Sequence, residues 1–249
     1  MFGRMGNGGS WYLGMIRGIP LIVHWSFLLI LGWSGYQGYG IGGWRGGLFT
    51  ITLTLLLFVC VVLHELGHAL MARRYGILTR SITLLPIGGV AALDRIPRRP
   101  IQELLIAVAG PLVNVLIMAA LYPLTGWPAD FFVFRGLWGV GLMLELLFYV
   151  NLVMVVFNLI PAFPMDGGRI VRSLLALVVS YERATAIASV LGQVLALGMV
   201  AAGFYWNPFL ILIGIMIFFG ARKENQMVQR RSTLIVVDSG SDRRFIDIG

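Results

Sequence analysis

The chain has 249 residues, of which 58% are hydrophobic and 12% charged, and its mean hydropathy is +0.87. Soluble domains carry about a quarter charged residues, so this composition excludes an ordinary soluble domain and indicates a polytopic membrane protein. The net charge of +8 is better explained by membrane topology than by nucleic-acid binding, and the single cysteine excludes an intrachain disulfide framework.

Six apolar segments are predicted to be transmembrane helices by their length and their breakers. They cover about residues 20–37, 48–72, 101–125, 136–160, 184–204 and 208–221. The fold class expected is all-α, with residues 1–221 forming one six-helix membrane domain. Residues 222–249 are expected to be a short basic cytoplasmic tail with one strand-like run. The last two segments are split by Tyr205–Pro208 and form either a tight hairpin or one broken helix.

Lysine and arginine are unevenly distributed between the segments. With both termini cytoplasmic, 17 of the 19 lysine and arginine residues lie on the cytoplasmic side, and only Arg45 and Arg135 lie on the other. The positive-inside rule favours this multi-pass topology in the cell membrane. The second and fourth segments then run in the same direction and end in the same leaflet.

The second segment ends in the motif His64-Glu65-Leu66-Gly67-His68. Residues four apart share a helix face, so the two imidazoles can bind one metal ion while Glu65 serves as general base. Ionisable side chains in a membrane cost about 2.5–3.5 kcal/mol on insertion scales, which favours a functional reading over a structural one. Gly67 leaves room for another backbone or a substrate.

A catalytic zinc site needs a third protein ligand and an open position for water. Asp166 is favoured, because prolines precede it and Gly167 and Gly168 follow it, which predicts irregular backbone at that point. Irregular backbone at membrane depth is tolerated only where protein or a water-filled cavity covers it. A helix cap or turn former is the competing interpretation. The candidates for the third ligand are His24, Glu103, Glu145 and Asp166.

Three motifs, in this order, resemble the site-2 protease family of intramembrane zinc metalloproteases, in its prokaryotic type without a PDZ domain. They are HELGH at 64–68, AGPLVN at 109–114 and NLIPAFPMDGG at 158–168. The resemblance covers about residues 20–220 and implies a three-helix catalytic core from the second to fourth spans. It implies one zinc ion per chain, held by His64, His68 and Asp166. Glu65 would activate water.

The resemblance also assigns roles around the site. Asn158 matches an asparagine that supports the transition state, and its alternative role is a buried amide that bonds a neighbouring helix. Gly110 and Pro111 are expected to pack rather than react, Asn114 to supply a hydrogen bond across the core, and Gly167 to lie near the site.

Residues 80–93 are too short and too broken to form a span. The resemblance suggests a membrane-associated β segment there, and a plain amphipathic loop is the alternative. An open strand edge can pair with an extended substrate, so Gly88, Gly89 and Val90 are candidate substrate-binding residues.

Three other polar residues are less clearly assigned, and two of them have two interpretations. His24 lies either near the zinc or at the interface beside Trp25, and the interface is favoured. Cys60 faces the metal or is a small buried hydrophobe, and the second is favoured. Glu145 is expected to make an interhelical hydrogen bond.

The sequence therefore predicts an intramembrane zinc metalloprotease that cleaves within or next to a transmembrane helix of a membrane-bound regulatory substrate. Its active site is expected toward the cytoplasmic leaflet. The alternative is a zinc-binding membrane protein of the same fold that acts as a chaperone-like partner without proteolysis. A transporter would show internal repeats, which the sequence lacks. The expected partners are a transmembrane protein substrate and the lipid bilayer, without nucleic acid, and a homo-oligomer is left open.

Overall fold

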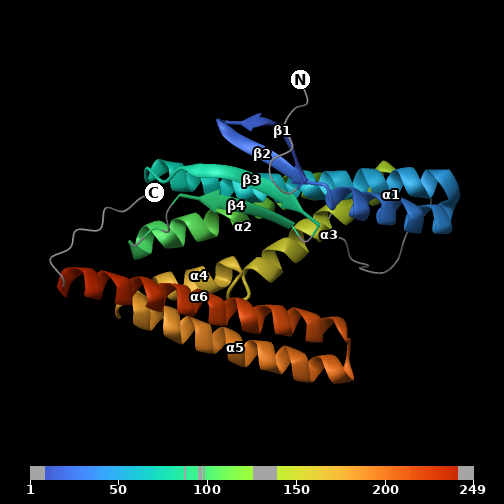
Figure 1. Cartoon of the computed structure of the whole chain (residues 1–249). Coiled ribbons are helices and arrows are strands. Elements are labelled where there is room, and N and C mark those ends of the chain that lie inside the picture. The colour runs from blue at the N-terminus through green and yellow to red at the C-terminus, as the bar shows by residue number, and fades with distance from the viewer. Residues whose placement is uncertain (1–8, 87, 95–96, 98, 126–138, 241–249) are drawn as a thin grey trace. The chain divides into compact units, whose positions relative to one another are not determined.

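The computed structural model describes residues 9–86, 88–94, 97, 99–125 and 139–240 (Figure 1). The chain divides into two compact units, residues 1–97 with 108–157 and residues 98–107 with 158–249. In chain order the elements are β1 (Ser10–Ile16), β2 (Ile19–His24), α1 (Phe27–Arg74), β3 (Thr79–Leu85), β4 (Gly88–Leu93), α2 (Pro100–Thr125), α3 (Val140–Asn158), α4 (Asp166–Leu175), α5 (Tyr181–Tyr205) and α6 (Phe209–Gly240).

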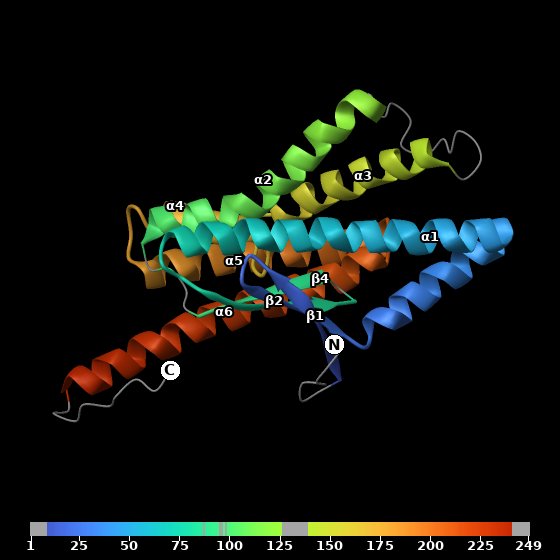
Figure 2. The same cartoon turned by 90° about the horizontal axis from the view of Figure 1, so that it is seen from above.

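Helix α1 is a hairpin of two helical arms, which meet at one end and diverge from there in Figure 2. The backbone reverses at Gly42 and Gly43, where Gly43 has φ +60° and ψ −150°, a conformation that glycine allows. Across the arms, Ser34 Oγ donates to the Thr50 carbonyl at 2.9 Å, and Thr50 Oγ1 donates to the Ser34 carbonyl at 2.7 Å. The first two predicted spans are therefore the two arms of α1.

The four strands form one sheet in the order β1-β2-β3-β4. Strands β1 and β2 are antiparallel, as are β3 and β4, whereas β2 and β3 are parallel. Parallel neighbours need a long connection, and here the whole α1 hairpin provides it. The β segment predicted at residues 80–93 is confirmed, and the loop alternative is wrong. The predicted start of the first span at residue 20 is also wrong, because Ile19–His24 is a central strand. A short apolar run does not distinguish a strand from a helix by periodicity.

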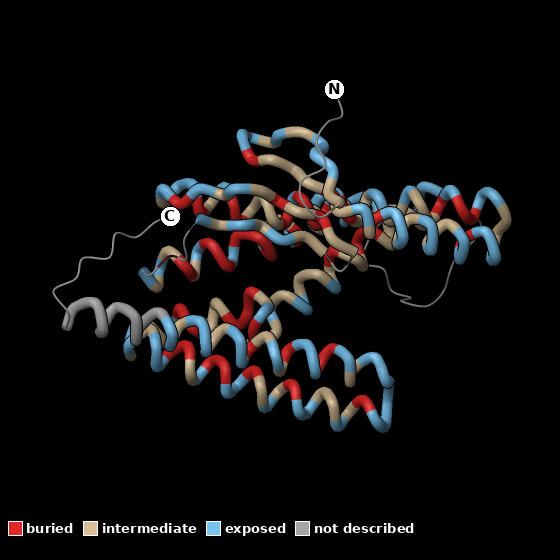
Figure 3. Tube along the Cα trace, viewed as in Figure 1, coloured by how far each residue is buried: buried red, intermediate tan, exposed pale blue. Residues whose placement is uncertain are grey.

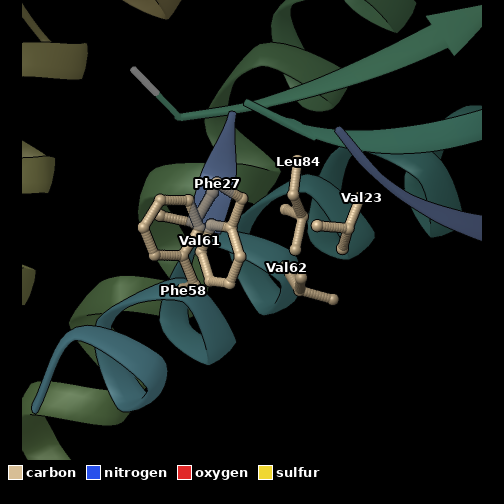
Figure 4. Close-up of a cluster of buried hydrophobic side chains, with 6 residues drawn as sticks. All are labelled: Val23, Phe27, Phe58, Val61, Val62 and Leu84. Atoms are coloured by element: carbon tan, nitrogen blue, oxygen red, sulfur yellow. The ribbon is translucent and has the colours of Figure 1, made fainter. Parts of the chain in front are cut away.

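A buried hydrophobic cluster joins the sheet to both arms of α1 (Figure 4). The Phe27 and Phe58 rings pack edge to face, with centroids 4.5 Å apart. This cluster holds α1 against the sheet over the turn that precedes His64. Its members are Val23, Phe27, Phe58, Val61, Val62 and Leu84.

In the second unit, α5 and α6 form a tight hairpin, so the broken-helix alternative is wrong. Figure 3 shows buried positions recurring along both helices. Small residues allow the close approach: a Cβ at Gly214 would lie 2.7 Å from the Ala196 carbonyl oxygen. Helix α6 continues to Gly240, past the predicted end of the last span at residue 221, so the strand-like run predicted beyond that point is wrong. Residues 222–230 contain mostly Arg, Lys, Glu and Gln, which favour helix.

Four described helices, α1, α2, α3 and α5, are long and apolar enough to cross a membrane. Helices α2 and α5 match the predicted spans 101–125 and 184–204 within three residues. The predicted fourth span begins at residue 136, outside the described residues, and its described part is α3. The sequence did not predict α4, an amphipathic helix of 10 residues that is too short to span.

Candidate metal centre

His64 and His68 lie on the second arm of α1 with their Nε2 atoms 3.1 Å apart. Both side chains are buried, with 3% and 6% of their surface exposed. Two nitrogens that bind one tetrahedral zinc at 2.0–2.1 Å lie about 3.3 Å from each other. The rings are held nearly perpendicular, at 83°. The pair therefore fits a single zinc ion.

Helix α2 approaches this pair through glycine. A Cβ on Gly110 would collide with the tips of both imidazoles, at Nε2 and Cε1 of His68 and at Nε2 of His64. Gly67 on α1 makes the reciprocal contact, since a Cβ there would lie 2.7 Å from the Ala109 carbonyl oxygen. The two glycines let α1 and α2 touch and leave the space beside the imidazole nitrogens open.

Strand β4 passes beside Glu65, the residue that directly follows His64. A Cβ on Gly89 would lie 2.9 Å from Glu65 Cγ and 2.9 Å from Val61 Cγ1. Gly88 has φ +136°, which disfavours other residues, and Val90 is exposed. Strand β4 is the last strand of the sheet, so one of its edges is not paired with another described strand, and Gly89 in β4 packs against Glu65.

The second unit contains Asp166 and Asn158. Asp166 is buried and is the first residue of α4, where the helix dipole stabilises a carboxylate. The N-cap is Met165, so Asp166 itself is not the cap. The predicted irregular backbone before it is confirmed: the Ala162 N–H donates to the Ile160 carbonyl at 2.7 Å, and Met165 N–H to Ala162 at 3.0 Å. Asn158 ends α3 and is half-buried.

Glycines again allow the close packing of this segment. A Cβ on Gly167 would collide with the carbonyl oxygens of Leu159 and Ile160, and one on Gly168 would lie 2.6 Å from the Phe163 nitrogen. The loop after α3 therefore folds directly onto the first turn of α4, which fixes the backbone that carries Asp166.

Sequence reasoning missed the partner of Glu103, which it considered only as a metal ligand. Arg172 of α4 is 1% exposed and donates through Nε to Glu103 Oε1 at 3.0 Å and through Nη1 to Glu224 Oε1 at 2.6 Å. Its guanidinium also lies over the rings of Phe163 and Tyr181. Burial lowers the pKa of Arg172, but the charges of Glu103, Tyr181 and Glu224 and the hydrogen bond to Glu103 together outweigh burial and leave this pKa raised. The sequence offered no local signal for this pair, because Glu103 lies in the predicted third span and Arg172 in the connection between the predicted fourth and fifth spans.

Two of the three remaining polar candidates have partners other than a metal site. His24 Nδ1 lies 2.6 Å from Ser26 Oγ, and its ring is beside Trp25. Cys60 is buried, and its sulfur accepts from Asn151 Nδ2 at 3.4 Å. Glu145 is half-buried on α3.

Comparisons with known proteins give one family. The model of peptidase family M50 matches residues 52–128 and 137–199. A zinc metalloprotease of Methanocaldococcus jannaschii is 42% identical over 223 residues, which are 86% of this chain and 60% of the relative. The stage IV sporulation protein FB of Bacillus subtilis is 30% identical over 131 residues, 52% of this chain and 42% of that protein.

Among solved structures, the site-2 protease from Methanocaldococcus jannaschii superposes with a TM-score of 0.61 at 38% identity, covering 96% of this chain and 98% of that one. The chain spans 60% of the length of the archaeal curated relative. These matches confirm the family resemblance, and with the apolar helices they make the chain a multi-pass membrane protein. The chain belongs to peptidase family M50 and is a member of the site-2 protease family.

Proposed function

We propose that this protein is an intramembrane zinc metalloprotease that hydrolyses a peptide bond within or next to a transmembrane helix of a membrane-bound substrate. The observation that carries this proposal is the buried pair of Nε2 atoms, 3.1 Å apart, on an apolar helix that also carries Glu65 between them. Family membership supports it, because the archaeal relative at 42% identity is a zinc metalloprotease.

We assign the third zinc ligand to Asp166. His64, His68 and Asp166 are buried and together offer two imidazole nitrogens and a carboxylate oxygen, a donor set suited to one zinc ion. The N-terminus of α4 favours the ionised carboxylate that binds metal. Asp166→Ala should lower the zinc content per chain, whereas Asp94→Ala, which removes an exposed ion-paired carboxylate, should not. Full occupancy in Asp166→Ala would place the third ligand elsewhere.

The mechanism assigns separate tasks to the side chains. A bound zinc ion supplies a Lewis acid that polarises the scissile carbonyl and lowers the pKa of water. Glu65 takes the proton from the attacking water and returns it to the leaving amine. The Asn158 amide donates to the oxygen on which negative charge develops. Loss of any one of these groups slows the reaction, while the groups that stay keep their own contributions.

Substrate is held by the edge of β4. A transmembrane helix must unwind before hydrolysis, and the extended segment pairs with Gly88, Gly89 and Val90 by backbone hydrogen bonds. The 2.9 Å approach of a Cβ at Gly89 to Glu65 Cγ supports this placement, because a chain paired to β4 lies next to the general base. Glycine at this point keeps the space between the strand and Glu65 clear.

The proposed topology has six spans: the two arms of α1, then α2, α3, α5 and the apolar start of α6. Both termini are cytoplasmic in this topology, which the positive-inside rule favours. Arg73 and Arg74 end α1 about one to two turns after His68, which puts the histidine pair near the cytoplasmic leaflet. In a Cys60→Ser background, Gln229→Cys should be labelled from the cytoplasm and Asn207→Cys from outside. The reverse pattern would contradict this orientation.

Cleavage of transmembrane peptides by the purified protein tests the function. A chelator should abolish cleavage, and stoichiometric Zn²⁺ should restore it where Mg²⁺ does not. Cleavage by metal-free protein would refute the proposal. The chaperone-like alternative predicts that peptides bind to the zinc-loaded protein without any product.

A further inference from the structure

Two asparagines, Asn114 on α2 and Asn151 on α3, lie in the core of the first unit with 0% of their surface exposed. A buried amide without hydrogen-bond partners is costly, and more so in a membrane helix. Each of these amides is bonded on both its oxygen and its nitrogen, and the bonds join them in one line that ends on His64.

The donor and the acceptor of every hydrogen bond in this line follow from the end opposite His64, the backbone carbonyl of Leu147. The Leu147 carbonyl can only accept, so the Asn151 atom that lies 2.8 Å from it is the donating Nδ2. Asn151 Oδ1 therefore faces Asn114 and accepts from Asn114 Nδ2, also at 2.8 Å. This leaves Asn114 Oδ1, an acceptor, 2.6 Å from His64 Nδ1.

An acceptor at Nδ1 determines the protonation of the imidazole. His64 Nδ1 must carry the proton, so its Nε2 keeps the lone pair. Nε2 is the atom that lies 3.1 Å from His68 Nε2. The line of hydrogen bonds thus keeps His64 Nε2 unprotonated, which is the form that binds metal. It also holds the ring with Nε2 toward His68 Nε2.

We infer that Asn114 and Asn151 are positioning residues that select the tautomer and the orientation of His64, with the backbone carbonyl of Leu147 as their fixed reference. This inference rests on the proposed function, in which His64 holds zinc. Hydrogen-bond partners on the far nitrogen of a metal-binding histidine change metal affinity by about 10- to 100-fold. Asn151 does so without touching the histidine.

Two sulfur atoms lie beside the line as weaker acceptors. Asn151 Nδ2 approaches Cys60 Sγ at 3.4 Å, and Asn114 Nδ2 approaches Met154 Sδ at 3.6 Å. Neither is needed to set the direction of the bonds, because the Leu147 carbonyl already does so. Cys60 is therefore a matched control: it packs against the same amide and has no part in the tautomer.

The two asparagines predict different consequences on substitution. Asn114→Leu removes the acceptor at His64 directly, whereas Asn114→Asp keeps an acceptor there. Asn151→Leu removes the acceptor for Asn114 Nδ2, so the Asn114 amide is free to turn by about 180°. Its NH₂ then faces His64 Nδ1 and selects the Nε2–H tautomer, which cannot bind metal through Nε2.

The experiment measures the zinc dissociation constant of the purified full chain by competition with a chromophoric chelator. We expect Asn114→Leu and Asn151→Leu to weaken zinc binding about 10- to 100-fold. Asn114→Asp should lose clearly less than Asn114→Leu, and Cys60→Ala should match the parent. Because the chain has three histidines, ¹⁵N-histidine NMR can show the proton on His64 Nδ1 in the parent and its displacement in Asn151→Leu.

The outcomes separate the inference from the proposed function. A parent protein that binds no zinc overturns the proposed function. A parent that binds zinc while both leucine variants bind it equally well overturns the inference alone, as does an equal loss in Cys60→Ala. Size-exclusion profiles and thermal unfolding check each variant. If the leucine variants do not fold, the parent spectrum decides, and a proton on His64 Nε2 overturns the inference.

Discussion

Gly110→Ala adds one methyl group at the point where α2 faces the two histidines. That methyl would collide with Nε2 and Cε1 of His68 and would lie 2.8 Å from His64 Nε2. Alanine suits a helix better than glycine by about 0.8–1.0 kcal/mol, but overpacking costs about 1–3 kcal/mol. Because the contact is with the ring nitrogens, this cost appears mainly in metal binding.

At about 1.4 kcal/mol per tenfold change, 1–3 kcal/mol corresponds to about 5- to 150-fold weaker zinc binding. The assay is zinc competition on the purified protein, together with its thermal unfolding in the absence of metal. Gly198→Ala on α5 is the matched control, since a Cβ there meets nothing within 4 Å. Zinc affinity in Gly110→Ala equal to that of the parent would refute the reasoning that α2 borders the metal position.

Three further predictions concern the ion pair, the strand and the metal. Arg172→Met leaves the buried Glu103 without its partner and should destabilise the fold by about 3–5 kcal/mol in thermal or denaturant unfolding. The double variant Arg172→Met, Glu103→Leu should recover much of this loss. An Arg172→Met variant as stable as the parent would contradict the prediction. Gly89→Val should slow peptide cleavage by pressing on Glu65 while zinc content stays unchanged, and unaltered cleavage would count against β4 as the substrate strand. Zinc at about 100 times its dissociation constant should stabilise the folded protein by about 2.7 kcal/mol. This is measured as a higher melting temperature that a chelator reverses. A melting temperature that zinc does not change would argue against a metal site in the folded state.

The chemistry of the histidine pair was readable from the sequence because it is local. His64 and His68 are one helical turn apart on the same chain segment, so spacing alone predicts that their imidazoles converge. The proline and glycine pattern around Asp166 was equally readable, because both residue types restrict or release the backbone wherever they occur.

The errors arose where tertiary pairing decides the local structure. Ile19–His24 has an apolar run that suits a helix or a strand, and its pairing with β1 and β3 makes it a strand. Similarly, residues beyond 221 were read as a tail because of their charge, but charged helix formers extend α6.

Long-range polar partners were also outside the reach of sequence reasoning. Arg172 and Glu103 are 69 residues apart, and Asn114 and Asn151 are 37 apart. Nothing in either local pattern specifies the other member of the pair. The sequence marked Asn114 as an amide that bonds across the core, but the order of donors and acceptors that leads through Asn151 and Asn114 to His64 follows only from the folded geometry.

Replacement of Glu65 by glutamine separates zinc binding from proton transfer at the site. Glutamine has nearly the same shape but cannot take up a proton, so Glu65→Gln should keep the zinc content of the parent and lose about 10²- to 10⁴-fold in peptide cleavage. Both quantities are measured on the same preparation, zinc by elemental analysis and cleavage with a transmembrane peptide. Zinc binding with cleavage abolished is the predicted result, and cleavage retained at the parent rate would contradict the account.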